Sequence, residues 1–163
     1  MTATLQDLRE LLAAPLAAAA AADPARPEAA RAALTAAFPH DGPAGRALRE
    51  ALVAAVQAGV ICERGKPAIR YSRLARPGES GHDLSVDFVW MTGPGIDHVH
   101  PRGEVNLCYA VEGNPRFDGH GEGWVVFAPG SRHVPTVTDG RMLIVYFLPG
   151  GAVEWVSPPV AKS

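Results

Sequence analysis

Cysteine is scarce in this 163-residue chain, which contains only Cys62 and Cys108. Two cysteines so far apart form neither a disulfide framework nor a CxxC motif for metal or redox chemistry. The first residues, Met-Thr-Ala-Thr-Leu-Gln-Asp, lack the basic segment that opens a secretory signal. We therefore expect a cytoplasmic protein whose thiols are reduced.

Long hydrophobic runs and an excess of positive charge are also absent. The stretch from Leu11 to Ala22 is mostly alanine and contains Pro15, so no transmembrane helix is expected. Lys and Arg number 15 against 17 Asp and Glu, a formal net charge of −2 that argues against nucleic-acid binding. Neither a GxGxxG nor a P-loop motif is present. A small molecule is thus the expected partner, rather than a nucleic acid, a membrane or a nucleotide cofactor.

Alanine content divides the chain near Gly59, because 22 of the first 60 residues are alanine but only 6 of the remaining 103. The first part has leucines at helical spacing, namely Leu5, Leu8, Leu12 and Leu16. Thr4 and Asp7 resemble a capping box at its start. A second helix is expected from Pro27 to Phe38, and a third is expected to be capped at Asp41 and to end at Gly59. Residues 1–59 are therefore predicted to form an alanine-rich helical region.

β-Branched and aromatic residues dominate after Gly59, with glycine and proline turns at short intervals. This rhythm is typical of an all-β sandwich or barrel. The expected strands cover residues 68–74, 83–91, 105–111, 123–128, 141–148 and 153–157. The turns between them include Gly113-Asn114-Pro115. A mainly β domain is therefore predicted over residues 60–163, with the helices packed outside it.

Five of the six histidines lie between residues 82 and 133, and three of them have the spacing of a metal site. On a strand, His98 and His100 point to the same face, Glu104 follows shortly after, and His133 comes just after a Pro-Gly turn. Three imidazoles and a carboxylate suit one divalent transition metal such as Zn, Fe, Mn or Ni. The alternatives are a metal that only stabilises the fold, or histidines that are hydrogen-bonded in the core.

These residues resemble the two motifs of the cupin superfamily, approximately G-x5-H-x-H-x3-E-x6-G and G-x5-P-x-G-x2-H-x3-N. The first corresponds to GPGIDHVHPRGEVNLCYAVEG at residues 93–113, and the second to GWVVFAPGSRHVPTV at residues 123–137. The glycine and proline spacings differ and Val137 stands at the final asparagine position, but all four ligand positions are kept. The resemblance implies a double-stranded β-helix, or jelly-roll, barrel whose metal ligands are His98, His100, Glu104 and His133.

A narrower resemblance extends from about Arg70 to Glu154. RYSR at 70–73, HVHPRGE at 98–104, FDG at 117–119 and YFLPGGAVE at 146–154 are similar to segments of the small cupin-type 4-hydroxylaminobenzoate lyases of bacterial nitrobenzoate degradation. The resemblance implies that 4-hydroxylaminobenzoate and water give 3,4-dihydroxybenzoate and ammonia, which is redox-neutral overall. The metal would act as a Lewis acid. Glu104 is either its fourth ligand or a group that moves a proton.

A benzoate substrate needs a counter-charge, and arginine binds carboxylates through two parallel hydrogen bonds. The candidates, each of which is otherwise a solvated surface residue, are Arg70, Arg73, Arg102 and Arg132. Strand alternation places Arg70 and Arg73 on opposite faces, so at most one points into the barrel. Candidates for an aromatic wall, with plain core packing as the alternative, are Tyr71, Trp90, Trp124 and Tyr146. Asn106 and Cys108 share the side-chain parity of Glu104 and are expected to face the cavity.

Two other classes of function fit the same residues. A mononuclear iron dioxygenase acting on a small aromatic would use the same ligands and consume oxygen, and a cupin that only binds a small ligand would catalyse nothing. In the leading hypothesis the partner is a small aromatic carboxylate. The alanine-rich helices and a sheet edge leave apolar surface that predicts a homodimer.

Overall fold

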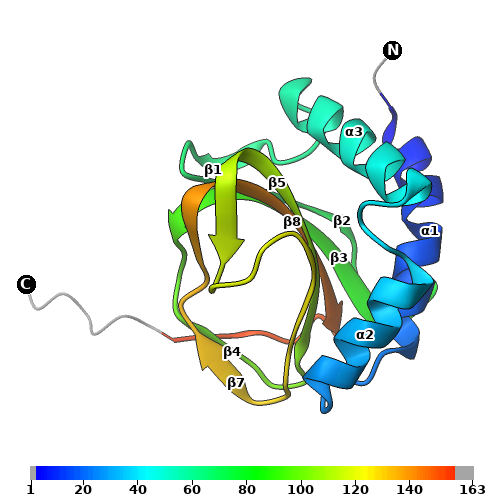
Figure 1. Cartoon of the computed structure of the whole chain (residues 1–163), viewed down its shortest axis with the longest axis vertical. Coiled ribbons are helices and arrows are strands. Elements are labelled where there is room, and N and C mark those ends of the chain that lie inside the picture. Colours follow the sequence, from blue (N-terminus) through cyan, green and yellow to red (C-terminus); the bar gives the residue numbers. More distant parts are fainter. Residues whose placement is uncertain (1–2, 157–163) are drawn as a thin grey trace, which may run out of the picture.

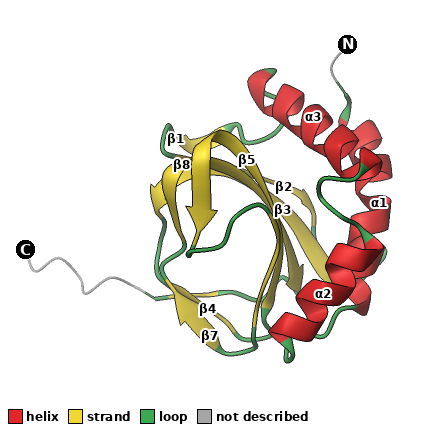
Figure 2. Cartoon of the chain, in the orientation of Figure 1, coloured by secondary structure: helices red, strands yellow, loops and turns green. Residues whose placement is uncertain are grey.

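Three helices precede the strands in the computed structural model, which describes residues 3–156 (Figure 1). They are α1 (Leu5–Ala21), α2 (Pro27–Ala37) and α3 (Pro43–Gln57), and all three cover the same side of the β structure (Figure 2). The predicted capping box is present at α1, where the Thr4 hydroxyl accepts a hydrogen bond from the Asp7 amide. α3 is capped by Gly42 and not by Asp41 as predicted. None of the helices in residues 3–156 has the length and apolar character needed to cross a membrane.

Two antiparallel sheets face each other after the helices. One has the order β1-β2-β3-β8-β5-β6 and the other β7-β4-β9. The strands are β1 (Arg64–Lys66), β2 (Ile69–Ala75), β3 (Leu84–Pro94), β4 (His98–His100), β5 (Glu104–Phe117), β6 (Gly123–Phe127), β7 (Ser131–His133), β8 (Thr136–Pro149) and β9 (Glu154–Trp155). Double-sheet antiparallel barrels of this kind include the cupins. The predicted mainly β fold with a helical N-terminal region is confirmed.

One predicted turn is wrong, because β5 continues through Gly113-Asn114-Pro115 to Phe117. Its register against β8 shifts between Ala110 and Glu112 and again between Gly113 and Arg116. Extra residues therefore bulge from a continuous strand. Gly113 makes this geometry available because its φ is 70°, a backbone conformation that favours glycine.

The six-stranded sheet has two faces with different surroundings. Alternate residues of β5 and β8 pack in one cluster together with leucines of the helices. These strand residues are Val105, Leu107, Tyr109, Leu143, Val145 and Phe147. Residues of the opposite parity, including Cys108, Ile144 and Tyr146, belong to a second cluster inside the barrel. We call this second side of the sheet the inner face. The alternation therefore separates a helix-covered hydrophobic face from the face that carries Glu104, Asn106 and Cys108.

Large side chains on the helix-covered face of the sheet also form hydrogen bonds to the backbone of the helical region. The Trp124 indole donates to the carbonyl of Phe38 at 2.8 Å, and the Tyr109 hydroxyl donates to the carbonyl of Gly45 at 2.9 Å. Trp90 lies in the same helix-facing cluster. Trp90 and Trp124 therefore belong to the core beneath the helices, which was the alternative to a role as walls of the barrel cavity.

Candidate metal centre

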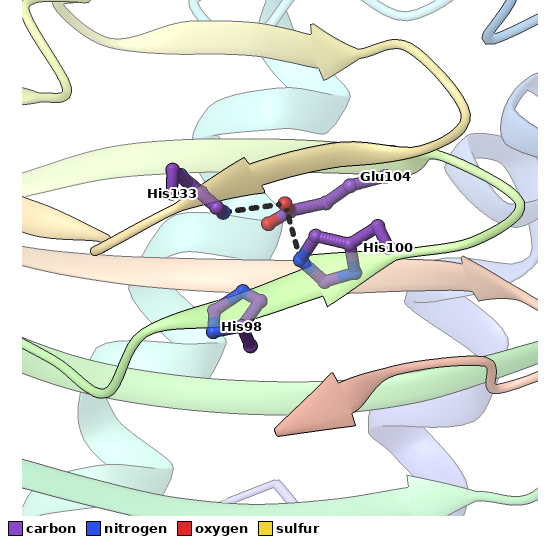
Figure 3. A group of neighbouring side chains, drawn as sticks. All are labelled: His98, His100, Glu104 and His133. Carbon is purple, nitrogen blue, oxygen red and sulfur yellow. Dashed lines mark ion pairs between the residues drawn. The ribbon is translucent and has the colours of Figure 1, made fainter. Parts of the chain in front are cut away.

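Strand pairing brings the four predicted ligands together. His98 and His133 are directly opposed on the antiparallel strands β4 and β7, so their imidazoles share one face. His100 lies two residues further on β4, on the same face. A turn at residues 101–103, in which the Gly103 amide donates to the His100 carbonyl at 3.1 Å, then leads into β5. Glu104, the first residue of β5, is thereby placed beside the imidazoles (Figure 3).

One ligand atom from each of the four residues lies within 4.8 Å of the others, a grouping that could hold a metal ion. The Glu104 Oε2 atom is 2.7 Å from Nε2 of His100 and 3.1 Å from Nε2 of His133. Glu104 is fully buried, and the exposed fractions of the His100 and His133 side chains are 2% and 14%. The sequence therefore predicted correctly which residues gather, although their binding of a metal stays a prediction.

The hydrogen bonding of these residues fits a metal. Within the described chain, Nε2 of His98, both ring nitrogens of His100, Nε2 of His133 and both Glu104 oxygens are buried without a hydrogen-bond partner. The short contacts to Glu104 Oε2 thus lack the alignment of hydrogen bonds. Burying so many unpaired polar atoms is costly unless another group binds them. Neutral nitrogens and a carboxylate are suitable ligands for a divalent transition metal.

Two of the imidazoles are oriented through their other nitrogen. Nδ1 of His98 is 2.7 Å from the carbonyl oxygen of Ile96, and Nδ1 of His133 is 2.5 Å from Oδ2 of Asp118. Because a carbonyl or a carboxylate can only accept, Nδ1 carries the proton in both rings. Nε2 is then the atom available to bind a metal, as in histidine sites supported by a carboxylate.

Asp118 was not identified as a functional residue from the sequence. Its other oxygen, Oδ1, accepts a hydrogen bond from the Thr136 amide at 2.8 Å, which fixes the carboxylate at the start of β8. Asp118 has a φ of 47°, a conformation that Asp adopts more readily than most residues. Its signals in the sequence are its place before Gly119 in a turn and in the FDG segment at residues 117–119, and neither indicates a contact with His133.

Charge interactions shift the pKa values of this group in different directions. Burial lowers the pKa of His98. For His133, burial acts in the same direction, but the Asp118 and Glu104 carboxylates outweigh it and raise the pKa to about 9. Burial acts to raise the pKa of Glu104, whereas the imidazoles of His100 and His133 lower it to about 2. Glu104 is therefore ionised, and in the metal-free protein a proton on His133 balances its charge.

The aromatic side chains next to the histidines differ from those singled out in the sequence, of which Tyr146 is the one that lies inside the barrel. The Phe127 ring centre lies 4.7 Å from that of His133, and the Phe117 ring centre lies 6.2 Å from His133 and 6.4 Å from Tyr146. Trp155 lies 5.3 Å from His98 by the same measure. Phe117, Phe127 and Trp155 had no distinguishing spacing, because only the strand pairing brings them to the histidines.

The four candidate arginines have different surroundings. Arg102 forms an ion pair with Asp83 at 2.8 Å, and Arg132 forms one with Asp97 at 2.7 Å. Arg70 lies over the ring of Trp90, on the helix-covered face. Arg73 forms an ion pair with Asp87 at 2.6 Å. Binding of a substrate carboxylate by any of the four stays a prediction.

Solved structures with a similar backbone include an RmlC-like cupin from Shewanella frigidimarina, with 20% identity and a TM-score of 0.39 over 53% of this chain and 80% of that one. Another is the DMSP lyase DddQ from Ruegeria pomeroyi, with 22% identity and a TM-score of 0.40 over 72% of this chain and 66% of that one.

Two relatives named 4-hydroxylaminobenzoate lyase are more similar in sequence. The protein from Nocardioides sp. (strain LMS-CY) is 32% identical over 102 residues, and the protein from Pseudomonas putida is 30% identical over 105 residues. These matches cover 57% and 55% of this chain and 60% of each relative, so the chain spans less than two thirds of the relatives it matches. The sequence pattern of the 4-hydroxylaminobenzoate lyase family matches residues 14–155, which include all four candidate ligands. The chain therefore belongs to the 4-hydroxylaminobenzoate lyase family.

Proposed function

We propose that this protein is a metal-dependent lyase that converts 4-hydroxylaminobenzoate and water into 3,4-dihydroxybenzoate and ammonia. The observation that carries the proposal is the convergence of four residues, His98, His100, Glu104 and His133, whose buried ligand atoms lack hydrogen-bond partners in the described part of a chain of this family. The family supplies the substrate, and the donor set supplies the dependence on a metal.

The proposed reaction balances without an external oxidant or reductant. A water oxygen bonds to the ring carbon ortho to the nitrogen, the N–O bond takes up the electron pair as it breaks, and the hydroxyl group lost from the nitrogen leaves as water with a proton from the attacking water. A second water then adds at the carbon that bears the nitrogen, the nitrogen leaves as ammonia, and loss of the proton on the attacked ring carbon restores the aromatic ring. Two waters are consumed and one is released, so the substrate and one net water contain all the atoms of the two products. This balance agrees with a chain that has no dinucleotide-binding motif.

The roles of the residues follow from their surroundings. His98, His100, His133 and Glu104 would hold a divalent ion, which when bound supplies Lewis-acid chemistry at the hydroxylamine oxygen. Ile96 and Asp118 keep the Nε2 atoms of His98 and His133 available as ligands. Glu104 has two open roles, as the fourth ligand or as the group that moves a proton, because its Oε1 atom has no partner among the described residues. Phe117 and Phe127 offer apolar contacts for the aromatic ring.

The test is an assay of ammonia release from 4-hydroxylaminobenzoate under strictly anaerobic conditions, using protein whose metal has been restored. We expect stoichiometric 3,4-dihydroxybenzoate and ammonia. His100→Ala should lose both metal and turnover, whereas the matched variant His82→Ala, which removes an exposed histidine from a turn, should retain both. Turnover that requires oxygen would favour the dioxygenase instead. No turnover by the metal-loaded protein would refute the proposed reaction.

A further inference from the structure

Four polar residues form a row across the inner face of the six-stranded sheet. Arg73 on β2 is directly opposite Asp87 on β3, and Asp87 is opposite Tyr146 on β8. Tyr146 is in turn opposite Asn106 on β5. Directly opposed residues of antiparallel strands point to the same face, so their side chains lie next to one another. We call these four residues the polar row.

The packing of neighbouring residues shows that the polar row is on the inner face. Tyr146 and Met91 belong to the cluster inside the barrel, and Ile69 packs against it. Met91 on β3 and Ile69 on β2 are opposed and have the same parity as Asp87 and Arg73. Arg70 has the other parity and is opposed to Trp90 beneath the helices. The sequence predicted only that the two arginines lie on opposite faces, and this packing identifies Arg73, and not Arg70, as the arginine on the barrel side.

At one end of the row, Asn106 has an unusual environment. Its side chain is fully buried, and both its amide nitrogen and its amide oxygen lack a hydrogen-bond partner among residues 3–156. It is two residues from Glu104 on the same face of β5, about 7 Å along the strand. A buried amide without partners is costly, so this position is suited to a ligand group that both donates and accepts hydrogen bonds.

At the other end, Arg73 is accessible and held in a fixed orientation. Its side chain is 45% exposed, and its Nε atom donates to Oδ1 of Asp87 at 2.6 Å. The second oxygen of Asp87 accepts a hydrogen bond from the buried Ser85 hydroxyl at 2.8 Å. Because Asp87 is bonded through Nε, the opposite edge of the guanidinium, formed by the two Nη atoms, remains suited to a second carboxylate.

We propose that the polar row binds the substrate lengthwise, with its carboxylate on Arg73, its ring over Tyr146 and its hydroxylamine group hydrogen-bonded to Asn106 beside Glu104. This inference rests on the proposed function. Arg73 reaches over β3 to Asp87, so its guanidinium lies about two strand spacings, ~10 Å, from β5. The length of a para-substituted benzoate together with the Asn106 side chain matches this distance between the guanidinium and β5.

Charge determines the direction of binding. No lysine or arginine in the described part of the chain is buried, whereas the Glu104 carboxylate is fully buried beside Asn106. A substrate carboxylate at the inner end would find no lysine or arginine there and would compete with the hydroxylamine group for the proposed metal, whereas Arg73 offers a separate cationic side chain at the outer end. The neutral hydroxylamine carries both an N–H donor and an oxygen acceptor, which complement the Asn106 amide.

The first test compares Arg73→Met with its matched control Arg70→Met, which alters the same strand on the opposite face. The metal-loaded variants are assayed with 4-hydroxylaminobenzoate and with phenylhydroxylamine, which lacks the carboxylate. Arg73→Met should raise KM for the benzoate about tenfold or more with a smaller change in kcat, because a charged anchoring bond is lost in ground and transition states alike. KM for phenylhydroxylamine should change less than twofold in either variant. Equal KM values for the benzoate in the two variants would overturn the role of Arg73.

The second test is Asn106→Leu, which replaces the amide by an apolar side chain of similar size. Removal of an unpaired buried amide should leave Tm unchanged or raise it, while kcat falls about tenfold. A residue with only a structural role would lower Tm and leave the kcat of the folded fraction unchanged. That outcome would overturn the role of Asn106.

Calorimetric binding of 3,4-dihydroxybenzoate to the metal-loaded proteins separates this inference from the proposed function. Binding that weakens in Arg73→Met but not in Arg70→Met would support the polar row even if the wild-type protein catalysed no turnover. Turnover by the wild-type protein with equal binding by both variants would overturn the polar row and leave the proposed reaction standing. Neither turnover nor binding by the wild-type protein would refute both.

Discussion

Metal binding at pH 7 is expected to release a proton from His133. In the metal-free protein this imidazole lies between two carboxylates, with Nδ1 at 2.5 Å from Asp118 and Nε2 at 3.1 Å from Glu104. Burial opposes the charge, but the two carboxylates outweigh it and hold the pKa of His133 at about 9. A metal needs the lone pair on Nε2, so it must displace the proton that balances Glu104 in its absence.

The size of the effect follows from the distance between that pKa and neutrality. At pH 7 a group with a pKa of about 9 is ~99% protonated, so proton competition weakens metal binding about 100-fold, or ~2.7 kcal/mol. Burial lowers the pKa of His98, and the pKa of Glu104 is about 2, so neither adds a proton to this release. The apparent affinity should therefore rise about tenfold per pH unit up to pH ~9 and then level off.

Isothermal titration of metal-free protein with Zn²⁺, in two buffers of different protonation enthalpy, measures the number of protons released. About one proton per ion from His133 is expected at pH 7. Asp118→Asn serves as the matched variant, because it keeps the size of the side chain but removes a charge that raises the pKa of His133. It should release fewer protons at pH 8. Identical heats in the two buffers at pH 7, or an affinity for Zn²⁺ that does not change between pH 7 and 9, would refute the release of a proton from His133.

Further predictions concern stability, metal affinity and assembly. The raised pKa of His133 contributes up to about 3 kcal/mol to the stability of the metal-free protein, and this contribution is complete below pH ~6.5. It should be lost as the pH rises through about 9, and urea unfolding at several pH values would measure the loss. Asp118→Asn should weaken Zn²⁺ binding about 10- to 100-fold in competition with a chromophoric chelator at pH 9, and an unchanged affinity would contradict its positioning role. Leu52→Ala, at a fully buried position of α3, should lower the free energy of unfolding by about 2–5 kcal/mol, and a loss below about 1 kcal/mol would show that α3 adds little to the core. Sedimentation at micromolar concentration is expected to give a homodimer, and a monomer alone would count against it.

Local sequence was informative wherever a local interaction determines the structure. The Thr4 capping box forms because its two partners are three residues apart, and His98 and His100 share a face because a strand alternates. Alternation also placed Arg70 and Arg73 on opposite faces. Which face lies inside the barrel depends on pairing with β3 and β8, residues far along the chain, so the sequence left the two arginines equivalent.

The same reason explains what the sequence missed. Asp118 reaches His133 across 15 residues through the end of β5 and the start of β8, and no spacing rule describes that contact. The continuation of β5 through Gly113-Asn114-Pro115 has a related cause. Turn propensities favour a chain reversal there, but pairing with β8 on both sides of the bulges keeps the strand extended.

The two faces of β5 explain how the barrel can hold polar atoms that lack partners. Val105, Leu107 and Tyr109 are fully or almost fully buried against the helix-covered core, and they supply the apolar burial that drives folding. Glu104 and Asn106 alternate with them and keep four oxygen and nitrogen atoms buried without partners. Those atoms oppose folding until a ligand binds them, so the helices must stabilise the sheet from outside. One face of β5 thus supplies stability and the other supplies the site, which explains why the N-terminal helical region contributes none of the proposed metal ligands. A substitution that weakens the helix packing is therefore expected to lower the free energy of unfolding while the arrangement of the site residues is kept.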